Sequence, residues 1–351
     1  MQAIVVTKLV SEKGQPVADN IEHRTDWPDE PNPAPGELLI KTEASAFNHM
    51  DLWIGKGLPG HELQYPRIGG ADGCGRVEAV GEGVDETWLG RRVVINAAIP
   101  QPVRTRPGDP PASTLAPSYQ LLGETINGMH REYFRVPATN ARDVGDADPT
   151  LAAAFGLTML TAYSMMLTKA QLRPGQSVLI TGAGGGVATS ALAIAKHMGC
   201  PVCVTSRHQW KLDKAKALGA DHTVLDEGLD WSRDVRTWTN KRGVDLAVDS
   251  TGKVSHLSCV KALARGGAYV TPGCTTGPDA TTDLARLFWN QLRFLGSTMG
   301  SPDEFAEVVA LFRAGRLAPV VDKVFTPSQA QDAYRRLEAG EQFGKLVIDW
   351  R

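Results

Sequence analysis

A cluster of glycines in the 351-residue chain has the spacing of a phosphate-binding loop. The apolar run SVLIT precedes the cluster and the helical pattern VATSALAIAKHMG follows it. Glycines in this context let the backbone turn tightly and bring the N–H groups of the next helix against a pyrophosphate. A merely flexible loop is the alternative, but the strand–loop–helix setting favours a dinucleotide site. The loop residues of this predicted site are Gly182, Gly184, Gly185, Gly186 and Val187.

The end of the next apolar run, PVCVT, predicts which dinucleotide binds. The chain continues TSRHQWK, so Ser206 stands where an NAD enzyme carries an acidic residue on the ribose. Arg207 follows directly and Lys211 comes one turn later. No carboxylate would repel a 2'-phosphate here, and two cations with a hydroxyl could bind it, which predicts NADPH. The alternative is that both cations are ordinary solvated charges at a helix start.

Six apolar runs alternate with helical patterns around this loop. They recur about every 20 to 26 residues, the length that a parallel β-α-β crossover needs. The pattern predicts a doubly wound, six-stranded parallel sheet of the Rossmann type. Strands are expected at residues 177–181, 201–205, 222–226, 244–250, 267–271 and 293–298.

The first part of the chain has a different pattern. Short alternating runs between Gly, Pro and Asp predict an antiparallel, barrel-like β domain over residues 1–140. In NHMDLWIGKG, Asn48 can cap a short helix that ends at Gly55 or Gly57. Residues 300–351 are expected to complete this domain, which leaves 141–299 as the cofactor domain. The Pro-rich stretch from 101 to 118 predicts an irregular lobe.

Composition restricts the partners. The formal net charge of -2 gives no positive field to hold nucleic acid or an anionic membrane. The opening MQAIVVTKLVSEKG lacks the apolar core of a signal peptide, and the apolar stretch from Leu151 is interrupted by polar residues, as in a buried helix. These features predict a cytoplasmic protein.

The five cysteines are scattered, as is typical of a reduced compartment. Cys200 and Cys203 form a C-x-x-C sequence at the start of PVCVT, where strand geometry turns them to different faces. We interpret them as buried structural thiols rather than a redox pair.

Over its whole length the sequence resembles the medium-chain dehydrogenase/reductase superfamily, most closely its zinc-free quinone oxidoreductase branch. The motifs that carry the resemblance are NHMDLW, GGADGCGRVEAVGEGV, LTMLTAY, the glycine loop, KLDKAKALGAD, VDSTG and GKLVI. The resemblance implies a GroES-like β-barrel catalytic domain, a Rossmann domain, a cleft between them, and a homodimer or homotetramer paired through the last strand of the sheet.

The resemblance also shows where catalytic zinc would be bound in related enzymes. The three ligand positions carry Asn48, Ala71 and Leu157 here, and none of these side chains is a thiolate or imidazole ligand. Gly-His-Glu at residues 60–62 lies ten residues upstream of the aligned motif, and no Cys or second His is spaced to complete a site, so we interpret it as a decoy. The lobe that normally carries four structural cysteines has none. We expect neither zinc.

Several catalytic-site residues follow from the resemblance. Asn48 and Asp51 are expected to line the cleft, and Thr161 to lie near the nicotinamide. The alternatives are helix capping for the first two and helix packing for Thr161. His49 and Tyr65 are candidate proton donors, with a purely structural role as the alternative.

Further cofactor contacts are implied by the resemblance, and each could instead be a plain turn residue. Lys345 is expected to approach the cofactor phosphates. The remaining implied contacts are Ser250, Thr251, Gly273, Ser297, Thr298 and Met299.

Together these features predict an NADPH-dependent enzyme that acts without a metal. Zinc is the Lewis acid that lets an alcohol lose its proton near neutral pH, so alcohol oxidation is disfavoured without it. Quinones and α,β-unsaturated carbonyl compounds accept hydride once they are oriented beside the nicotinamide. The alternatives are a zinc-type alcohol dehydrogenase and a non-catalytic NADPH-binding scaffold.

Overall fold

The computed structural model describes residues 1–12, 14–58, 62–99, 114–116, 119–228 and 230–351. The chain forms two compact units, which are described separately. Unit 1 comprises residues 1–157, 301–314 and 319–351, and unit 2 comprises 158–300 and 315–318. The first boundary lies inside a long helix, after Leu157, whereas the sequence predicted it after residue 140.

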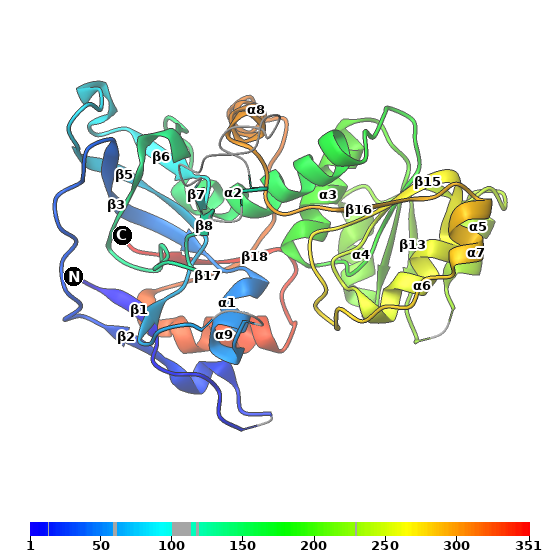
Figure 1. The fold of residues 1–351 in the computed structure, drawn as a ribbon, viewed down its shortest axis with the longest axis horizontal. Helices are drawn as coiled ribbons and strands as arrows, with labels where there is room; N and C mark the ends of the chain where they lie inside the picture. Colours follow the sequence, from blue (N-terminus) through cyan, green and yellow to red (C-terminus); the bar gives the residue numbers. More distant parts are fainter. Residues whose placement is uncertain (13, 59–61, 100–113, 117–118, 229) are drawn as a thin grey trace. The chain divides into compact units, whose positions relative to one another are not determined.

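Unit 2 contains a six-stranded parallel sheet with the strand order β13-β12-β11-β14-β15-β16. Figure 1 labels its strands β13, β15 and β16. All six predicted strands are therefore confirmed. The order reverses between β11 and β14, which is the switch point of a doubly wound sheet. The strands are β11 (Val178–Ile180), β12 (Val202–Ser206), β13 (His222–Leu225), β14 (Val244–Val248), β15 (Leu263–Thr271) and β16 (Arg293–Gly296).

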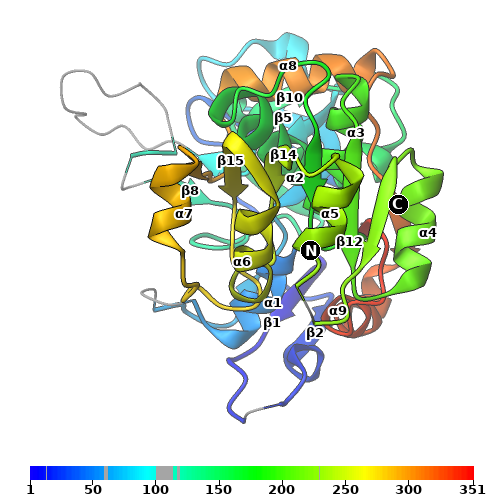
Figure 2. The same cartoon turned by 90° about the vertical axis from the view of Figure 1, so that its right-hand side faces the viewer.

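Helices pack on both faces of this sheet. Figure 2 shows α3 and α4 on the opposite side of the strands from α6. The core between strands and helices includes Leu179, Cys203, Val244 and Val260, all buried. The helices of unit 2 are η4 (Ser164–Lys169), α3 (Gly186–His197), α4 (Gln209–Ala217), α5 (Ser232–Trp238), α6 (Lys253–Ala262) and α7 (Leu284–Trp289).

One helical stretch, Pro149–Lys169, has the length and composition of a membrane span. It combines α2 (Pro149–Tyr163) with η4, and 72% of its most apolar window is buried inside the protein. The core helices of soluble proteins pass the same test, so the stretch is only weak support for a membrane location.

Unit 1 is built on a seven-stranded sheet with the path β10-β6-β5-β3-β18-β17, in which β9 also pairs with β3. Smaller sheets have the orders β2-β1-β4 and β7-β8. The strands are β1 (Ala3–Val6), β2 (Ile21–Arg24), β3 (Glu37–Ala46), β4 (Arg67–Ile68), β5 (Asp72–Val80), β6 (Arg92–Ile95), β7 (Ala98–Ile99), β8 (Gln120–Leu121), β9 (Tyr133–Pro137), β10 (Ala141–Asp143), β17 (Val321–Phe325) and β18 (Lys345–Asp349).

The closing strand β18 pairs antiparallel with β3, with Val347 opposite Ala46. In an antiparallel ladder, a residue that precedes a paired position on one strand lies opposite the residue that follows it by the same number on the other strand. Lys345, two residues before Val347, is therefore brought to Asn48, two residues after Ala46. Because of this register, the start of β18 lies beside the start of α1 (His49–Lys56).

Short helices complete unit 1. The predicted helix after Asn48 is confirmed as α1, which ends at Lys56 and is followed by Gly57 with φ 94°. The helical elements of unit 1 are η1 (Val17–Asn20), α1 (His49–Lys56), η2 (Glu86–Trp88), η3 (Ala138–Asn140), α8 (Pro302–Arg313), η5 (Pro327–Gln329) and α9 (Ala330–Glu338).

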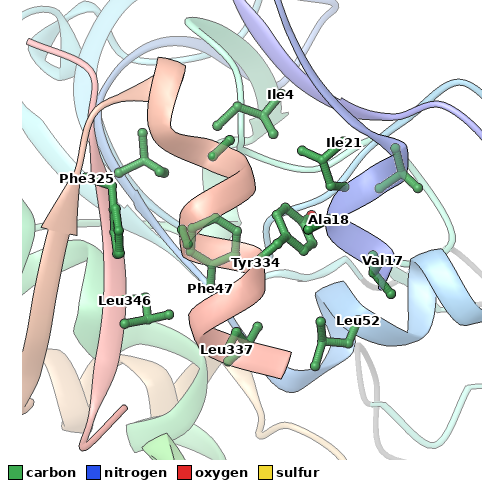
Figure 3. Close-up of a cluster of buried hydrophobic side chains, with 14 of the residues drawn as sticks. Ile4, Val17, Ala18, Ile21, Phe47, Leu52, Phe325, Tyr334, Leu337 and Leu346 are labelled. Carbon is green, nitrogen blue, oxygen red and sulfur yellow. The ribbon is translucent and has the colours of Figure 1, made fainter. Parts of the chain in front are cut away.

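A hydrophobic cluster packs α9 against α1, η1 and the sheet (Figure 3). Phe47 lies at its centre, with its ring 5.0 Å from that of Tyr334 in an edge-on arrangement. Burial of such side chains stabilises the fold by about 1.5 to 3 kcal/mol each. The cluster thereby fixes the backbone on either side of Asn48. Its other labelled members are Ile4, Val17, Ala18, Ile21, Leu52, Phe325, Leu337 and Leu346.

Candidate functional site

The glycine loop of unit 2 has the backbone that its sequence predicts. Gly182 and Gly184 have φ values of 69° and 96°, a region that favours glycine. Gly185 is the N-cap of α3, so the first N–H groups of that helix have no acceptor within it. A Cβ atom on Gly182 would lie 3.3 Å from Oγ1 of Thr251. The open turn and the free helix N-terminus fit a pyrophosphate.

A buried carboxylate, Asp249, connects the end of β14 to its neighbours. It is fully buried. Burial and the neighbouring Asp249 carboxylate both raise the pKa of Tyr269. The oxygens of Asp249 accept hydrogen bonds from the hydroxyls of Thr181, Ser255 and Tyr269 and from the backbone N–H groups of Thr251 and Gly252. The network fixes the turn after β14 beside the glycine loop.

The other predicted contacts of unit 2 follow the carboxyl ends of β14, β15 and β16, which meet at one edge of the parallel sheet. The carbonyl of Thr251 accepts the N–H of Thr276 at 2.8 Å. The hydroxyl of Thr161 donates to Sδ of Met299 at 3.9 Å, so the structure brings these two predicted residues together. The Ser297 hydroxyl is buried and has no partner within the described chain. Ser250, Gly273 and Thr298 lie in the same strand-end turns.

The predicted specificity residues lie at the end of β12. Ser206 is buried, and its Oγ accepts the N–H of His208 at 3.2 Å. The Lys211 ammonium lies 5.2 Å from the centre of the Trp210 ring, and the side chain is also buried. Of the three predicted residues, Arg207 is the exposed one.

In unit 1 the structure brings together Asn48, Asp72 and Lys345. The Lys345 ammonium donates to Oδ1 of Asn48 at 2.6 Å and to Oδ2 of Asp72 at 2.8 Å. The Asn48 amide donates to the same Asp72 oxygen at 2.9 Å. Oδ1 of Asp72 accepts the backbone N–H of Leu157 at 2.6 Å. All three polar side chains are buried, so this is a compact Asn–Asp–Lys cluster.

A second buried group adjoins this cluster through Asp51. Its carboxylate accepts the backbone N–H of Asn48 and of Gly70, both at 2.7 Å. Burial nevertheless raises the pKa of Asp51 to about 6. The N–H contact agrees with a capping role for Asp51, whereas the Asn48 side chain is directed to Lys345 and Asp72 instead.

His130 faces this carboxylate. Its Nε2 lies 3.7 Å from Oδ1 of Asp51, and its Nδ1 is 2.8 Å from the hydroxyl of Ser45. Burial first, and then the Lys345 charge, lower the pKa of His130 to about 3, so the imidazole is neutral and the contact is not an ion pair. His130 Nε2 and the Tyr334 hydroxyl have no hydrogen-bond partner within the described chain.

The cluster does not fit a catalytic zinc ion. The predicted ligand positions contribute an amide from Asn48, a methyl group from Ala71 and a backbone N–H from Leu157. The carboxylate next to these positions, Asp72, is bound by the Lys345 ammonium, which would repel a dication. No group of three or more His, Cys, Asp or Glu residues that could hold a metal occurs in the described part of the chain. Gly60, His61 and most of the Pro-rich lobe lie outside the described residues.

The expected contact of Lys345 with the cofactor phosphates stays a prediction. Within unit 1, the Lys345 residue is 3% exposed and its ammonium is bound by Asn48 and Asp72. Of the predicted proton donors, Tyr65 donates its hydroxyl to the carbonyl of Ile54 at 2.6 Å, and His49 is exposed beside Trp53. The Tyr65 contact is compatible with a structural role, and the proton-donor roles of both residues stay predictions.

Sequence reasoning missed four polar residues of these networks. Asp72 directly follows the predicted ligand position and lies in GGADG, so its carboxylate was a local signal. Asp249 belongs to VDSTG, where an acid ends a buried strand. His130 and Tyr334 had no local signal, because only tertiary packing brings them to Asp51.

Comparisons of the sequence and of the structure with known proteins all match dehydrogenases. The family described as "Alcohol dehydrogenase GroES-like domain" matches residues 34–146, and "Zinc-binding dehydrogenase" matches 186–314. A zinc-type alcohol dehydrogenase-like protein of Leptosphaeria maculans is 30% identical over 346 residues, covering 91% of this chain and 92% of that protein. The crystal structure of an NAD-dependent alcohol dehydrogenase is 37% identical, with a TM-score of 0.91 and 100% of both chains covered. The cobalt- and zinc-bound alcohol dehydrogenase of Pyrobaculum aerophilum is 28% identical, with a TM-score of 0.85, covering 100% of this chain and 99% of that one.

Proposed function

The chain belongs to the medium-chain dehydrogenase/reductase superfamily, and we propose that it is an NADPH-dependent oxidoreductase that reduces a quinone or an α,β-unsaturated carbonyl compound without zinc. The observation that carries this proposal is the Asn48–Asp72–Lys345 cluster at the position expected for a metal. An ion pair cannot ionise an alcohol as zinc does, whereas conjugated acceptors need no such activation.

The residues of unit 2 have separate roles in this proposal. The glycine loop and the N-terminus of α3 bind the pyrophosphate through backbone N–H groups. Asp249 holds the neighbouring turn in place, and the exposed Arg207 binds the 2'-phosphate. The reduced nicotinamide, when bound, supplies the hydride. Thr161 and Met299 orient the ring from one side.

The proposed function is tested with purified full-length protein, NADPH or NADH, and a panel of quinones, enals, enones and simple alcohols, together with metal analysis. We expect NADPH oxidation with the conjugated acceptors and no stoichiometric zinc. Alcohol oxidation that depends on bound zinc would support the zinc-type dehydrogenase. Tight NADPH binding without turnover of any acceptor would support the non-catalytic scaffold.

Charge reversal at Arg207 tests the cofactor preference. Arg207→Glu removes the proposed phosphate partner and places a carboxylate where NAD enzymes carry one. We expect the ratio of kcat/KM for NADPH to that for NADH to fall about 100-fold, equivalent to about 2.7 kcal/mol. Arg233→Glu, an exposed charge reversal elsewhere in unit 2, is the control and leaves the ratio unchanged. Equal use of both cofactors by the wild type would reject the NADPH assignment.

We propose that the protein forms a homodimer or homotetramer through the β16 edge of unit 2. Within the described chain β16 has one strand neighbour, β15. The preceding helix α7 exposes Leu284, Phe288 and Trp289 by 68, 69 and 68%. Exposed apolar side chains of this size next to an open strand edge are typical of an interface.

The double variant Phe288→Asp/Trp289→Asp is expected to shift the protein to a monomer in sedimentation velocity, because it places two charges in the proposed interface. Val254→Asp, at another exposed apolar residue of unit 2, serves as the matched comparison. Wild-type protein that sediments as a monomer would remove the basis for this interface.

A further inference from the structure

Two buried polar atoms of unit 1 have no hydrogen-bond partner in the part of the chain that the structure describes. They are Nε2 of His130 and the hydroxyl oxygen of Tyr334, and neither side chain is exposed. Both groups lie on the same side of Gly69 as the Asp51 carboxylate. A Cβ atom added to this glycine would be 2.7 Å from Oδ1 of Asp51, 3.3 Å from the Tyr334 hydroxyl and 3.6 Å from Cδ2 of His130. The three polar side chains therefore converge where Gly69 contributes no side chain.

The other side chain packed against these two groups is apolar. The centre of the Phe47 ring lies 4.5 Å from that of the His130 ring and 5.0 Å from that of the Tyr334 ring. A buried donor without a partner loses its hydration and gains nothing in return. Folded proteins therefore pair almost all such atoms, either with protein groups or with an ordered internal water molecule.

The residues on the other side of the imidazole determine which of its nitrogens carries the proton. Trp350 Nε1, which can only donate, gives its hydrogen to the Ser45 hydroxyl at 2.9 Å. The Ser45 oxygen lies 2.8 Å from Nδ1 of His130, and among the described residues this nitrogen is the one acceptor for the hydroxyl hydrogen. Ser45 therefore donates and Nδ1 accepts. Because the imidazole is neutral, its single proton is on Nε2.

With this proton on Nε2, the three groups offer complementary hydrogen-bonding sites. Nε2 of His130 is a donor, but Oδ1 of Asp51 lies 3.7 Å away, which is too far for a direct hydrogen bond. Oδ1 accepts the Gly70 N–H and keeps a second lone pair, and the Tyr334 hydroxyl can donate or accept. The N–H group would repel a cation and the carboxylate would repel an anion. A water molecule can accept from Nε2, donate to Oδ1 and bind the hydroxyl.

We infer that unit 1 binds one internal water molecule between Nε2 of His130, Oδ1 of Asp51 and the Tyr334 hydroxyl. Three partners are the usual number for a buried water. The water extends the chain of hydrogen bonds from Trp350 through Ser45 and His130 to Asp51. Since Asp51 binds a backbone N–H group at the start of α1, this chain connects the end of the protein to that helix. The site belongs to unit 1 alone and does not depend on the proposed function.

Tyr334→Phe distinguishes a hydrated hydroxyl from a dry one by the sign of its effect on stability. At pH 8, above the Asp51 pKa of about 6, we expect the midpoint of thermal unfolding to fall by about 2 to 4 °C. This is the effect of losing one hydrogen bond in a domain of this size. A dry hydroxyl would give an unchanged or raised midpoint, because phenylalanine removes an unsatisfied polar atom. That result would overturn the inference.

Two further tyrosines of unit 1 provide matched controls. Tyr65→Phe removes a hydroxyl that donates to the Ile54 carbonyl at 2.6 Å, so it shows how far the midpoint falls when a known hydrogen bond is lost. Tyr133→Phe, at a partly exposed residue of β9, is expected to leave the midpoint unchanged. The inference requires Tyr334→Phe to resemble the first control, and resemblance to the second would contradict it.

A crystal structure of the full-length protein and a nitrogen NMR spectrum test the geometry directly. We expect one electron-density peak at about 2.7 to 3.2 Å from His130 Nε2, Asp51 Oδ1 and the Tyr334 oxygen. A direct bond from Nε2 to Oδ1 with no such peak would overturn the inference. With ¹⁵N-labelled histidine at pH 8, the signals that disappear in His130→Phe should be those of an imidazole protonated at Nε2. A proton on Nδ1 would remove the donor that the water requires.

Discussion

Replacement of Asp249 by alanine is expected to lower the free energy of unfolding of unit 2 by about 4 kcal/mol. The carboxylate accepts hydrogen bonds from three hydroxyls and two backbone N–H groups in a fully buried place. Alanine leaves those donors without an acceptor, and a buried unpaired polar group costs about 1 to 3 kcal/mol. Hydroxyls can rotate toward other acceptors, but the N–H groups of Thr251 and Gly252 cannot.

Tyr269→Phe provides the graded comparison, because it removes one donor and leaves Asp249 with the others. Its expected cost is about 1 kcal/mol. Urea unfolding measures the size of both effects. Hydrogen exchange by mass spectrometry localises them, with faster exchange expected in peptides that contain Thr181 and residues 244–252. Equal destabilisation by the two variants would show that Asp249 does not organise this turn.

If the proposed function holds, Asp249→Ala is also expected to weaken binding of NADPH, because Asp249 holds the turn after β14 in place. Thr181 and Thr251 lie with their hydroxyl oxygens 3.3 Å apart, so the turn after β14 and the glycine loop share one anchor. Through this contact, loss of the Asp249 carboxylate would disturb the glycine loop as well as the turn after β14. Asp249 thus links the stability of the sheet to the geometry of its functional edge.

The fold of unit 2 could be predicted because its signals are local. Each strand is a short apolar run and each crossover a periodic helix, so six runs were sufficient to define the sheet. The main difference is β15, which begins at Leu263 rather than Gly267. Leu263 pairs with Val244 before an irregularity in the ladder, and a pairing of this kind leaves no mark in one strand's sequence.

The candidate site of unit 1 could be predicted only in part for the opposite reason. Asn48 was identified from its motif, but its partner Lys345 is 297 residues away in sequence. The register of β18 on β3 brings them together, and periodicity within either strand does not specify that register. The resemblance implied that Lys345 contacts the cofactor phosphates, which stays a prediction, but it did not indicate the bond from Lys345 to the Asp72 carboxylate.

The buried pair of Asp51 and His130 is expected to give two variants with opposite pH dependence of stability. The Asp51 pKa is raised from its unfolded value of 3.8 to about 6, so its stabilising contribution is present at low pH and is lost as the pH rises toward 6. The His130 pKa is lowered from 6.5 to about 3, so its contribution is present above pH 6.5 and is lost on acidification. Between about pH 4 and 6 the two slopes cancel in the wild type.

Asp51→Asn removes the pH dependence of stability that comes from Asp51 and leaves the opposite one from His130. Its free energy of unfolding is expected to fall relative to wild type by about 1.4 kcal/mol per pH unit from pH 6 to 4, or roughly 3 kcal/mol in total. His130→Phe leaves Asp51 titrating alone, so its stability should rise over the same range. Urea unfolding at pH 4, 5 and 6 measures both, with the exposed Asp146→Asn as control. Curves parallel to wild type for both variants would mean that neither group changes its protonation on folding. Opposite slopes would instead show that folded Asp51 keeps its proton up to about pH 6, beside the His130 Nε2 for which the described part of the chain provides no hydrogen-bond partner.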